Sequence, residues 1–255
     1  MHSIAACADG SKPSVHLDAL CVVHEDAHLL VLDKPAGLLA VPGRGPDKAD
    51  CLSARALRRW PDALVVHRLD QATSGLIVLA RSLAVQRQLS ADFAERRVAK
   101  RYEALVHGRL LLPPEASADA HRSDAALAHG VRAADGLSTT PADGWGLIDL
   151  PLLLDWPNRP RSRVDPLHGK PSQTHWRPLA HDPATDTTRV ALAPVTGRSH
   201  QLRVHLMALG HPIVGDALYG PPHDAAARLM LHACALGLTH PATGEALRWH
   251  CAAPF

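Results

Sequence analysis

The chain has 255 residues, with 27 Lys and Arg against 25 Asp and Glu and a formal net charge of +2. Its apolar content of 46% is typical of a globular protein, and no run approaches the roughly 18 apolar residues that a membrane span needs. Five scattered cysteines without a Cys-x-x-Cys pair indicate neither a disulfide framework nor a zinc knuckle. The polar start lacks the apolar core of a secretory signal, so we predict a cytoplasmic protein.

The first sixty residues alternate short apolar runs with Pro/Gly breaks. At Lys34, which precedes Pro35, a substrate contact and a plain surface lysine are the alternatives, and we favour the second. The elements predicted here are a short mobile lead-in at 1–19, two short strands between 21 and 33, a Pro/Gly loop at 41–50 and a short basic helix at 51–60.

Residues 65–80 contain an apolar run, the segment His67-Arg68-Leu69-Asp70, a small polar turn and a second apolar run. Turn residues between two runs of strand formers predict a strand-turn-strand unit. Asp70 then lies at its mouth, where a rigid scaffold can present a carboxylate to a cleft. A lone Asp in a turn more often hydrogen-bonds only its own turn, so the functional interpretation depends on further motifs.

A helix and a strand follow this unit. Ser82 is a predicted N-cap, because the apolar stripe of an amphipathic helix comes directly after it. A strand is predicted from 100 to 108, with Tyr102 on the same face as Ala104 and Val106. Alone, Tyr102 would be interpreted as a core aromatic. The stripe consists of Val85, Leu89 and Phe93.

Residues 113–146 break the pattern. They are rich in Ala, Asp, Ser, Pro and Gly and contain several acids without a sustained apolar period. This composition predicts a long, partly disordered acidic insert, to which we assign no chemistry.

The second half predicts strands and one further helix. Ser199 is expected to cap a helix at 199–209 whose apolar stripe is Leu202, Leu206 and Leu209. Arg203 lies off that stripe and is free to face a cleft. Strands are predicted at 147–154, 174–179, 188–195, 228–238 and 245–251. Because strands and helices mix without a regular βαβ alternation, the fold class is α+β.

Three blocks carry a family resemblance. Residues 67–75 match every fixed position of the His-Arg-Leu-Asp-x-x-Thr-Ser-Gly signature of the RluA family of RNA pseudouridine synthases. Lys100-Arg101-Tyr102 resembles the lysine-x-tyrosine segment of that family, and residues 197–216 resemble its third motif. Residues 41–44 and 155–160 are similar to the branch that acts on both a tRNA anticodon loop and large-subunit rRNA. The long insert at 113–146 departs from that branch.

The resemblance implies a fold and a domain organisation. The pseudouridine synthase fold is a long, bent, mixed but mostly antiparallel sheet in two halves, with flanking helices and a central active-site cleft. We expect a single catalytic domain at 20–255. The S4-type RNA-binding module that larger members carry before it is not expected here. The isomerisation needs no redox step or external group transfer, so no cofactor and no metal are expected, and no nucleotide-binding or metal-ligand motif occurs.

The resemblance also implies residue roles. Asp70 is the nucleophile, and attack on C1′, attack on C6 and a glycal route all remain open. Arg203 is placed against that carboxylate, since a nearby cation keeps it ionised and oriented. Tyr102 stacks on the target base and is a candidate for the late deprotonation at C5. The base must be flipped out of its RNA at a cost of roughly a few kcal/mol.

The remaining candidates concern RNA. Arg68 is expected to occupy the space that the flipped base leaves, whereas His67 either contacts backbone or braces the turn, and we favour bracing. Four more RNA-contact candidates are Lys100, Arg198, His200 and Gln201; for the last three, bracing of the 199–209 helix is an equal alternative.

The expected partner is RNA. Basic segments at 55–68, 81–101 and 159–177 form a phosphate-binding face or an ordinary solvated surface. The resemblance implies a tRNA anticodon stem-loop and a 23S rRNA hairpin as substrates, and single-stranded loops suit this reaction because their bases can splay. No membrane and no required protein partner are expected, and the chain is predicted to be a monomer.

Two rival functions were considered. A non-catalytic RNA-binding or assembly factor on the same fold would tolerate loss of Asp70, and the joint presence of Asp70, Tyr102 and Arg203 opposes it. A hydrolase using Asp70 with His67 or His200 would need a nucleophilic Ser or Cys, and no Gly-x-Ser-x-Gly elbow occurs.

Overall fold

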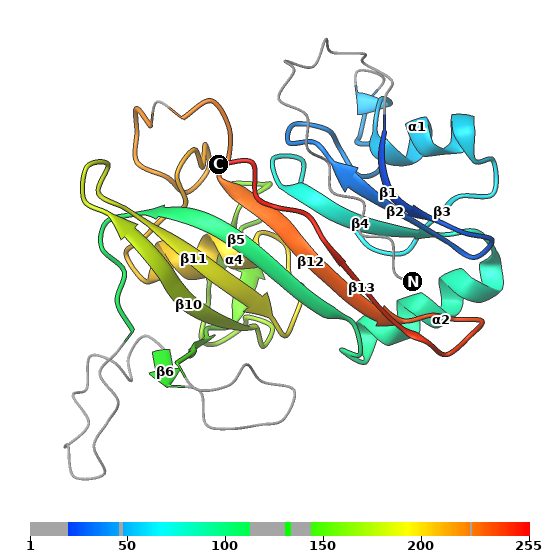
Figure 1. Cartoon of the computed structure of the whole chain (residues 1–255). Helices are drawn as coiled ribbons and strands as arrows, with labels where there is room; N and C mark the ends of the chain where they lie inside the picture. Colours follow the sequence, from blue (N-terminus) through cyan, green and yellow to red (C-terminus); the bar gives the residue numbers. More distant parts are fainter. Residues whose placement is uncertain (1–19, 46–47, 113–130, 134–143, 225) are drawn as a thin grey trace.

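The computed structural model describes residues 20–45, 48–112, 131–133, 144–224 and 226–255 (Figure 1). An eleven-stranded sheet runs in the order β1-β2-β4-β12-β5-β11-β10-β7-β6, with β13 paired to β12 and β3 to β4. The strands are β1 (Cys21–Glu25), β2 (Leu29–Lys34), β3 (Leu64–Val65), β4 (Ser74–Ala80), β5 (Ala99–His107), β6 (Val131–Ala133), β7 (Gly146–Asp149), β8 (Leu152–Leu154), β9 (Ser162–Val164), β10 (Gln173–Asp182), β11 (Thr187–Pro194), β12 (Leu231–Thr239) and β13 (Ala246–His250).

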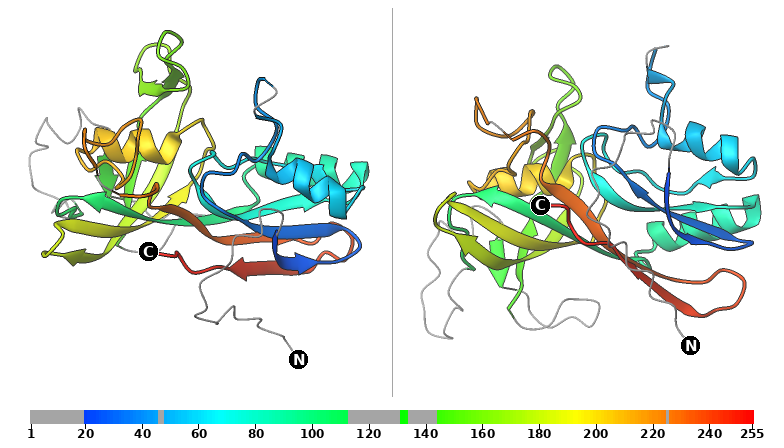
Figure 2. Two further views of the ribbon diagram at one scale, coloured as in Figure 1. Left: turned by 90° about the horizontal axis from the view of Figure 1, so that it is seen from above. Right: turned by 45° about the horizontal axis from the view of Figure 1, so that its top comes forward.

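The sheet has two halves joined by β12 and β5. Helices α1 (Leu52–Arg59) and α2 (Leu83–Ala94) belong to the half that contains β1, β2 and β4, and α4 (Gln201–Ala208) belongs to the other. Figure 2 shows α1 and α4 above the two halves, on the same side of the sheet. The predicted α+β class and the long, mostly antiparallel sheet are confirmed.

Alternating side chains explain the layering of the first half. In β2 and β4, both fully or nearly fully buried, alternate residues enter two different cores. Leu30, Leu32 and Ile77 pack with α1, whereas Leu29 and Val78 pack with α2. Burial on both faces accounts for the continuous apolar runs of these strands.

The junction of the two halves depends on a glycine. β12 is parallel to β4, with His232 opposite Ser74 and Ala233 opposite Gly75. Gly75 has φ +113°, and a Cβ there would lie 2.4 Å from the carbonyl oxygen of Ala233. Only glycine allows this approach, so the Thr-Ser-Gly end of the motif sets the close contact between the strand after Asp70 and the central strand.

Most predicted elements are confirmed, including the Ser82 cap, whose hydroxyl accepts a hydrogen bond from the Val85 amide. The predicted Ser199 cap is wrong. His200 is the N-cap of α4, in a left-handed conformation with φ +56°, and its side chain makes no cap hydrogen bond. Pro151 interrupts the strand predicted at 147–154, since a proline cannot donate to the ladder.

The acidic insert predicted at 113–146 lies largely outside the described residues, as does the lead-in at 1–19. Inside the insert, β6 pairs antiparallel with β7, so strand structure occurs where only a loop was predicted. Every helix in the described part of the chain is too short or too polar to cross a membrane.

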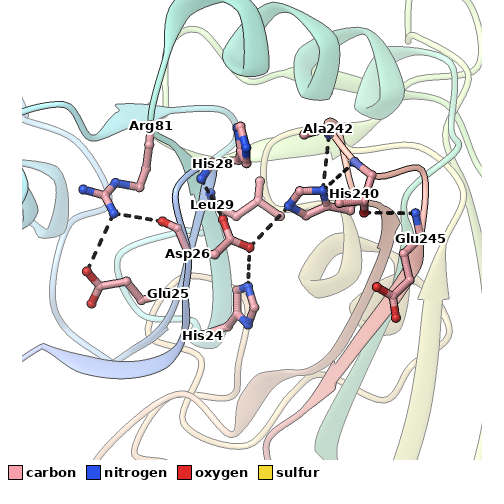
Figure 3. Close-up of polar contacts among 10 residues, drawn as sticks. His24, Glu25, Asp26, His28, Leu29, Arg81, His240, Ala242 and Glu245 are labelled. Atoms are coloured by element: carbon pink, nitrogen blue, oxygen red, sulfur yellow. Dashed lines mark hydrogen bonds and ion pairs between the residues drawn. The ribbon is translucent and has the colours of Figure 1, made fainter. Parts of the chain in front are cut away.

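A polar cluster ties the β1–β2 turn to the β12–β13 turn (Figure 3). The Asp26 carboxylate accepts main-chain hydrogen bonds from His28 and Leu29 and lies 2.7 Å from His24 Nε2 and 3.3 Å from His240 Nε2. Arg81 donates to the carbonyl oxygen of Asp26 at 2.8 Å. The cluster joins three segments that are far apart in the sequence.

Candidate active site

Asp70 lies in the turn between β3 and β4. Its carbonyl oxygen accepts a hydrogen bond from the Thr73 amide at 3.1 Å, which closes the turn. The next residue, Gln71, is tied to the loop after β2, because its carbonyl oxygen accepts from the Gly37 amide at 2.8 Å and its side chain donates to the Gly37 carbonyl oxygen at 3.0 Å. The turn that contains Asp70 is therefore fixed to the loop after β2.

Lys34 also fixes the turn that contains Asp70. Its side chain is fully buried, and Nζ donates to the carbonyl oxygens of Pro35, Leu38 and Gln71 at 2.9, 2.8 and 3.1 Å. Burial lowers the pKa of Lys34 to about 8, although the charge of Asp70 opposes this shift. The expectation of a surface lysine is wrong, since a chain of four methylenes carries the ammonium group to three main-chain carbonyl oxygens inside the fold.

Arg203 comes from α4 in the other half of the sheet. It forms a bidentate pair with Asp216, with Nε donating at 2.7 Å and Nη2 at 2.6 Å. Both side chains are almost completely buried. Burial alone would lower the pKa of Arg203, but the hydrogen bond and charge of Asp216, followed by the charge of Asp70, raise it. Arg203 is therefore a permanently charged, fixed group rather than a free one.

The third nitrogen of Arg203 faces the turn. Nη1 lies 3.9 Å from Oδ2 of Asp70, and Nε2 of His200 lies 4.0 Å from the same oxygen. These distances are those of ion pairs and are too long for hydrogen bonds. Because 32% of the Asp70 side chain is exposed, the structure brings a reachable carboxylate and a buried cation together from the two halves of the sheet.

Tyr102 lies on β5, at the centre of the sheet. The half-buried ring packs against the cores of both halves. Burial raises the pKa of Tyr102 well above its ordinary value, and the nearby charge of Asp70 raises it further. The phenol is thus neutral and close to Asp70, which brings the three predicted catalytic residues into one region.

A hydrogen-bond chain orients the ring of His200. The hydroxyl oxygen of Tyr219 accepts from the Ser162 amide at 2.7 Å and lies 2.8 Å from Nδ1 of His200. This contact fixes the orientation of the His200 ring, with Nδ1 on Tyr219 and Nε2 facing Asp70. Burial lowers the pKa of His200, while the charge of Asp70 opposes that shift.

His67 and Gln201 occupy bracing positions. His67 stacks on Phe93 with ring centroids 4.3 Å apart, and its Nε2 accepts from the Val78 amide at 3.2 Å. Burial, and then the charge of Lys100, lower the pKa of His67 to about 3. Gln201 is buried and bonds to Gln173, Thr174, Thr196 and the Arg198 amide, which favours the bracing alternative.

The three other RNA-contact candidates lie further toward solvent. Arg68 is exposed next to the Asp70 turn, and Arg198 is exposed before α4. Lys100 is half-buried, with Nζ 6.0 Å from the centre of the Phe93 ring. Of the three, Arg68 and Arg198 have the exposure that a phosphate or base contact requires.

The β8–β9 hairpin adds exposed cations on the α4 side of the sheet (Figure 2). Arg159 and Arg161 are exposed, and the Arg159 guanidinium lies 4.0 Å from the centre of the Trp156 ring, which is 64% exposed. The Ser162 amide, bonded to Tyr219, ties this hairpin to the site. An exposed indole beside arginines offers both a stacking surface and phosphate contacts.

Sequence reasoning missed three residues of the site: Lys34, Asp216 and Tyr219. Asp216 belongs to the third motif, but nothing in the sequence pairs it with Arg203. Its carboxylate also accepts from the Leu218 and Tyr219 amides at 2.9 and 3.1 Å. The folded loop therefore presents Asp216 and Tyr219 to α4 together.

Comparisons with known proteins identify the relatives of this chain. Residues 28–208 match the family described as RNA pseudouridylate synthase. The chain is 42% identical over 238 residues to the dual-specificity RNA pseudouridine synthase RluA of Escherichia coli (strain K12), covering 92% of this chain and 94% of the relative. The protein of the same name from Haemophilus influenzae is 40% identical over 238 residues, with the same coverage of both chains. A solved structure, human RNA Pseudouridylate Synthase Domain Containing 1, matches with a TM-score of 0.69 at 28% identity, covering 96% of this chain and 87% of that one.

Proposed function

This chain belongs to the RluA family of RNA pseudouridine synthases, and from that premise we propose that Asp70 is the nucleophile of its isomerase reaction. The reaction breaks the bond between N1 and C1′ of a uridine, turns the base and joins C5 to C1′. The proton on C5 is lost and N1 gains one, so the change is an isomerisation. A single catalytic domain at 20–255 carries it out.

The observation that carries the proposal is the environment of Asp70. Among the described residues its carboxylate makes no side-chain hydrogen bond, yet Arg203 and His200 face one oxygen at 3.9 and 4.0 Å. A cation at this distance attracts the carboxylate through space without occupying the lone pairs of the nucleophile. Arg203 keeps this position because Asp216 holds its other two nitrogens.

Tyr102 is assigned the face of the flipped uracil. Its ring stands between the two halves, beside Asp70, and the raised pKa keeps the hydroxyl protonated. A stacked aromatic replaces the neighbouring bases that a flipped nucleotide loses. Exposed Arg68, two residues before Asp70, is assigned the space that the base leaves in the RNA, with Arg198 and the β8–β9 arginines on backbone phosphates.

We assign the chain two RNA substrates, in line with the words "dual-specificity" in the name of the RluA relatives. They are uridine 32 in a tRNA anticodon loop and uridine 746 in a 23S rRNA hairpin. The support is 42% identity over nearly the whole chain, together with the exposed Trp156 and arginines of the β8–β9 hairpin. No protein partner is required, and the active form is proposed to be the monomer.

Tritium release from RNA with 5-tritiated uridine tests both parts. Wild type should release tritium from a tRNA anticodon stem-loop and from the rRNA hairpin, whereas Asp70→Asn should release none and still bind both RNAs. The control is Asp62→Asn, another turn aspartate paired with an arginine, at 3.0 Å from Arg81, which should retain activity. Tritium release by Asp70→Asn would refute the role of Asp70 as nucleophile. Release by wild type from one RNA alone would refute the dual specificity.

A further inference from the structure

A second cluster of chemically active side chains lies outside the candidate active site around Asp70, where β2, β12 and the end of β13 meet. It contains Asp33 in β2, His232 in β12 and Cys251 directly after β13. One carboxylate oxygen, one ring nitrogen and the sulfur all lie within 4.8 Å of one another. We propose that Asp33, His232 and Cys251 bind a divalent transition-metal ion of the zinc type.

His232 is the observation that points to a ligand. The residue is 1% exposed, and its buried Nε2 makes no hydrogen bond of ordinary distance and angle in the described part of the chain, where the main chain of Cys251 gives the ring a weaker hydrogen-bond contact. Nδ1 lies 2.8 Å from the Ser74 hydroxyl, so Nε2 is the nitrogen left for a ligand. A buried nitrogen without a well-formed hydrogen bond is costly, and coordination would give it a direct bond.

The geometry suits tetrahedral zinc. Bonds of about 2.3 Å to sulfur and about 2.0 Å to oxygen place two such ligands roughly 3.5 Å apart. Sγ of Cys251 lies 3.4 Å from Oδ2 of Asp33, so this edge is already of the right length. The imidazole has to approach by a small shift, and water would complete the four positions.

The surroundings also fit a metal ligand. A metal-bound histidine commonly donates a hydrogen bond from its other ring nitrogen, and with the ion on Nε2 the Nδ1–H of His232 would donate to the Ser74 hydroxyl oxygen, 2.8 Å away. The Ser74 hydroxyl oxygen in turn accepts from Arg228, which adds a positive charge behind the ligand. Both anionic ligands are therefore needed to offset the ion, and Cys251 would lose its thiol proton on coordination.

A metal here would tie the end of β13 to β2 and β12. Ser74, which contacts His232, begins the strand that follows the Asp70 turn. Occupancy should therefore raise the thermal stability of the sheet junction, independently of whether the uridine chemistry assigned to Asp70 is correct.

Titration of the metal-free full chain with Co²⁺, followed by displacement with Zn²⁺, tests the proposal. Wild type should bind one equivalent with a thiolate-to-cobalt charge-transfer band and a raised unfolding temperature. Cys251→Ser and Asp33→Asn should each lose the band and the temperature shift, and circular dichroism should confirm that both are folded. Cys21→Ser, which removes an exposed cysteine of β1, should retain both signals.

Three results would overturn the proposal. They are the absence of the band in wild type, its persistence in Cys251→Ser and its loss in Cys21→Ser. Since cobalt absorption and thermal stability are measured without RNA, none of these outcomes depends on pseudouridine formation.

Discussion

Replacing Asp216 by Asn should damage both the fold and the chemistry, for one reason. The carboxylate holds Nε and Nη2 of buried Arg203, and removing one partner of a buried pair costs about 3–5 kcal/mol. Asn retains one oxygen, but its amide places a donor against an arginine N–H. Asp70, 3.9 Å from Nη1, compensates part of the charge, so we expect a loss of about 3 kcal/mol, near the lower limit.

The free energy of unfolding from urea titrations gives the first number, and tritium release under single-turnover conditions gives the second. Asp224→Asn is the matched control, because Asp224 belongs to the same loop and accepts from the Gly215 and Ala226 amides. Its partner is His107 instead of Arg203. We expect the control to lower stability while retaining turnover. A stable Asp216→Asn variant with native turnover would refute the role given to the pair.

Three further changes test single features. Tyr102→Phe should reduce kcat about 100-fold if the hydroxyl takes part in proton transfer, with the RNA dissociation constant unchanged; an unchanged kcat would limit Tyr102 to stacking. For Lys34, burial lowers the pKa from 10.5 to about 8, so the unfolded state binds more protons between these values. Urea titrations should therefore show wild type gaining stability relative to Lys34→Met from pH 8 to pH 10.5; a constant difference would contradict this. For Asp26, burial raises the pKa, but the hydrogen bonds from His24 and the turn amides outweigh burial and lower the pKa from 3.8 to about 2. The stability advantage of wild type over Asp26→Asn should be full above pH 3.8 and disappear as the pH falls through 2. Thermal unfolding measured across this pH range checks it, and a difference in unfolding temperature that does not change with pH would argue against it.

Local patterns predicted most of the fold correctly. The Val85, Leu89 and Phe93 stripe and the Ser82 cap are properties of adjacent residues, and α2 has both. The Ser199 cap failed because a tertiary network decides that position. Gln201 uses its side chain on Thr196 and the Arg198 amide, and the chain enters α4 through a left-handed His200. Capping preference is a local signal, and here long-range hydrogen bonds override it.

The candidate site was predicted only in part, because long-range contacts that the sequence does not report also decide it. The motif identified Asp70, Tyr102 and Arg203 individually, and the fold places them near one another from two halves of the sheet. Lys34 carried a misleading signal, because a lysine before a proline turn normally faces water. Its burial depends on three carbonyl oxygens supplied by two separate segments. No sequence periodicity reports such an arrangement.

The three guanidinium nitrogens of Arg203 have different partners, and this explains how a buried cation can assist the proposed nucleophile without immobilising it. Two of its nitrogens are committed to Asp216, which fixes the plane of the guanidinium, and Nη1 is left facing Asp70. A direct hydrogen bond would stabilise the carboxylate ground state and reduce its reactivity. At 3.9 Å the charge still acts through space, while the lone pairs remain available to a sugar or base carbon. In the proposed mechanism Asp216 acts by holding Arg203 at this distance. A substitution that brings Arg203 into direct contact with Asp70 should then slow the reaction even in a stable protein.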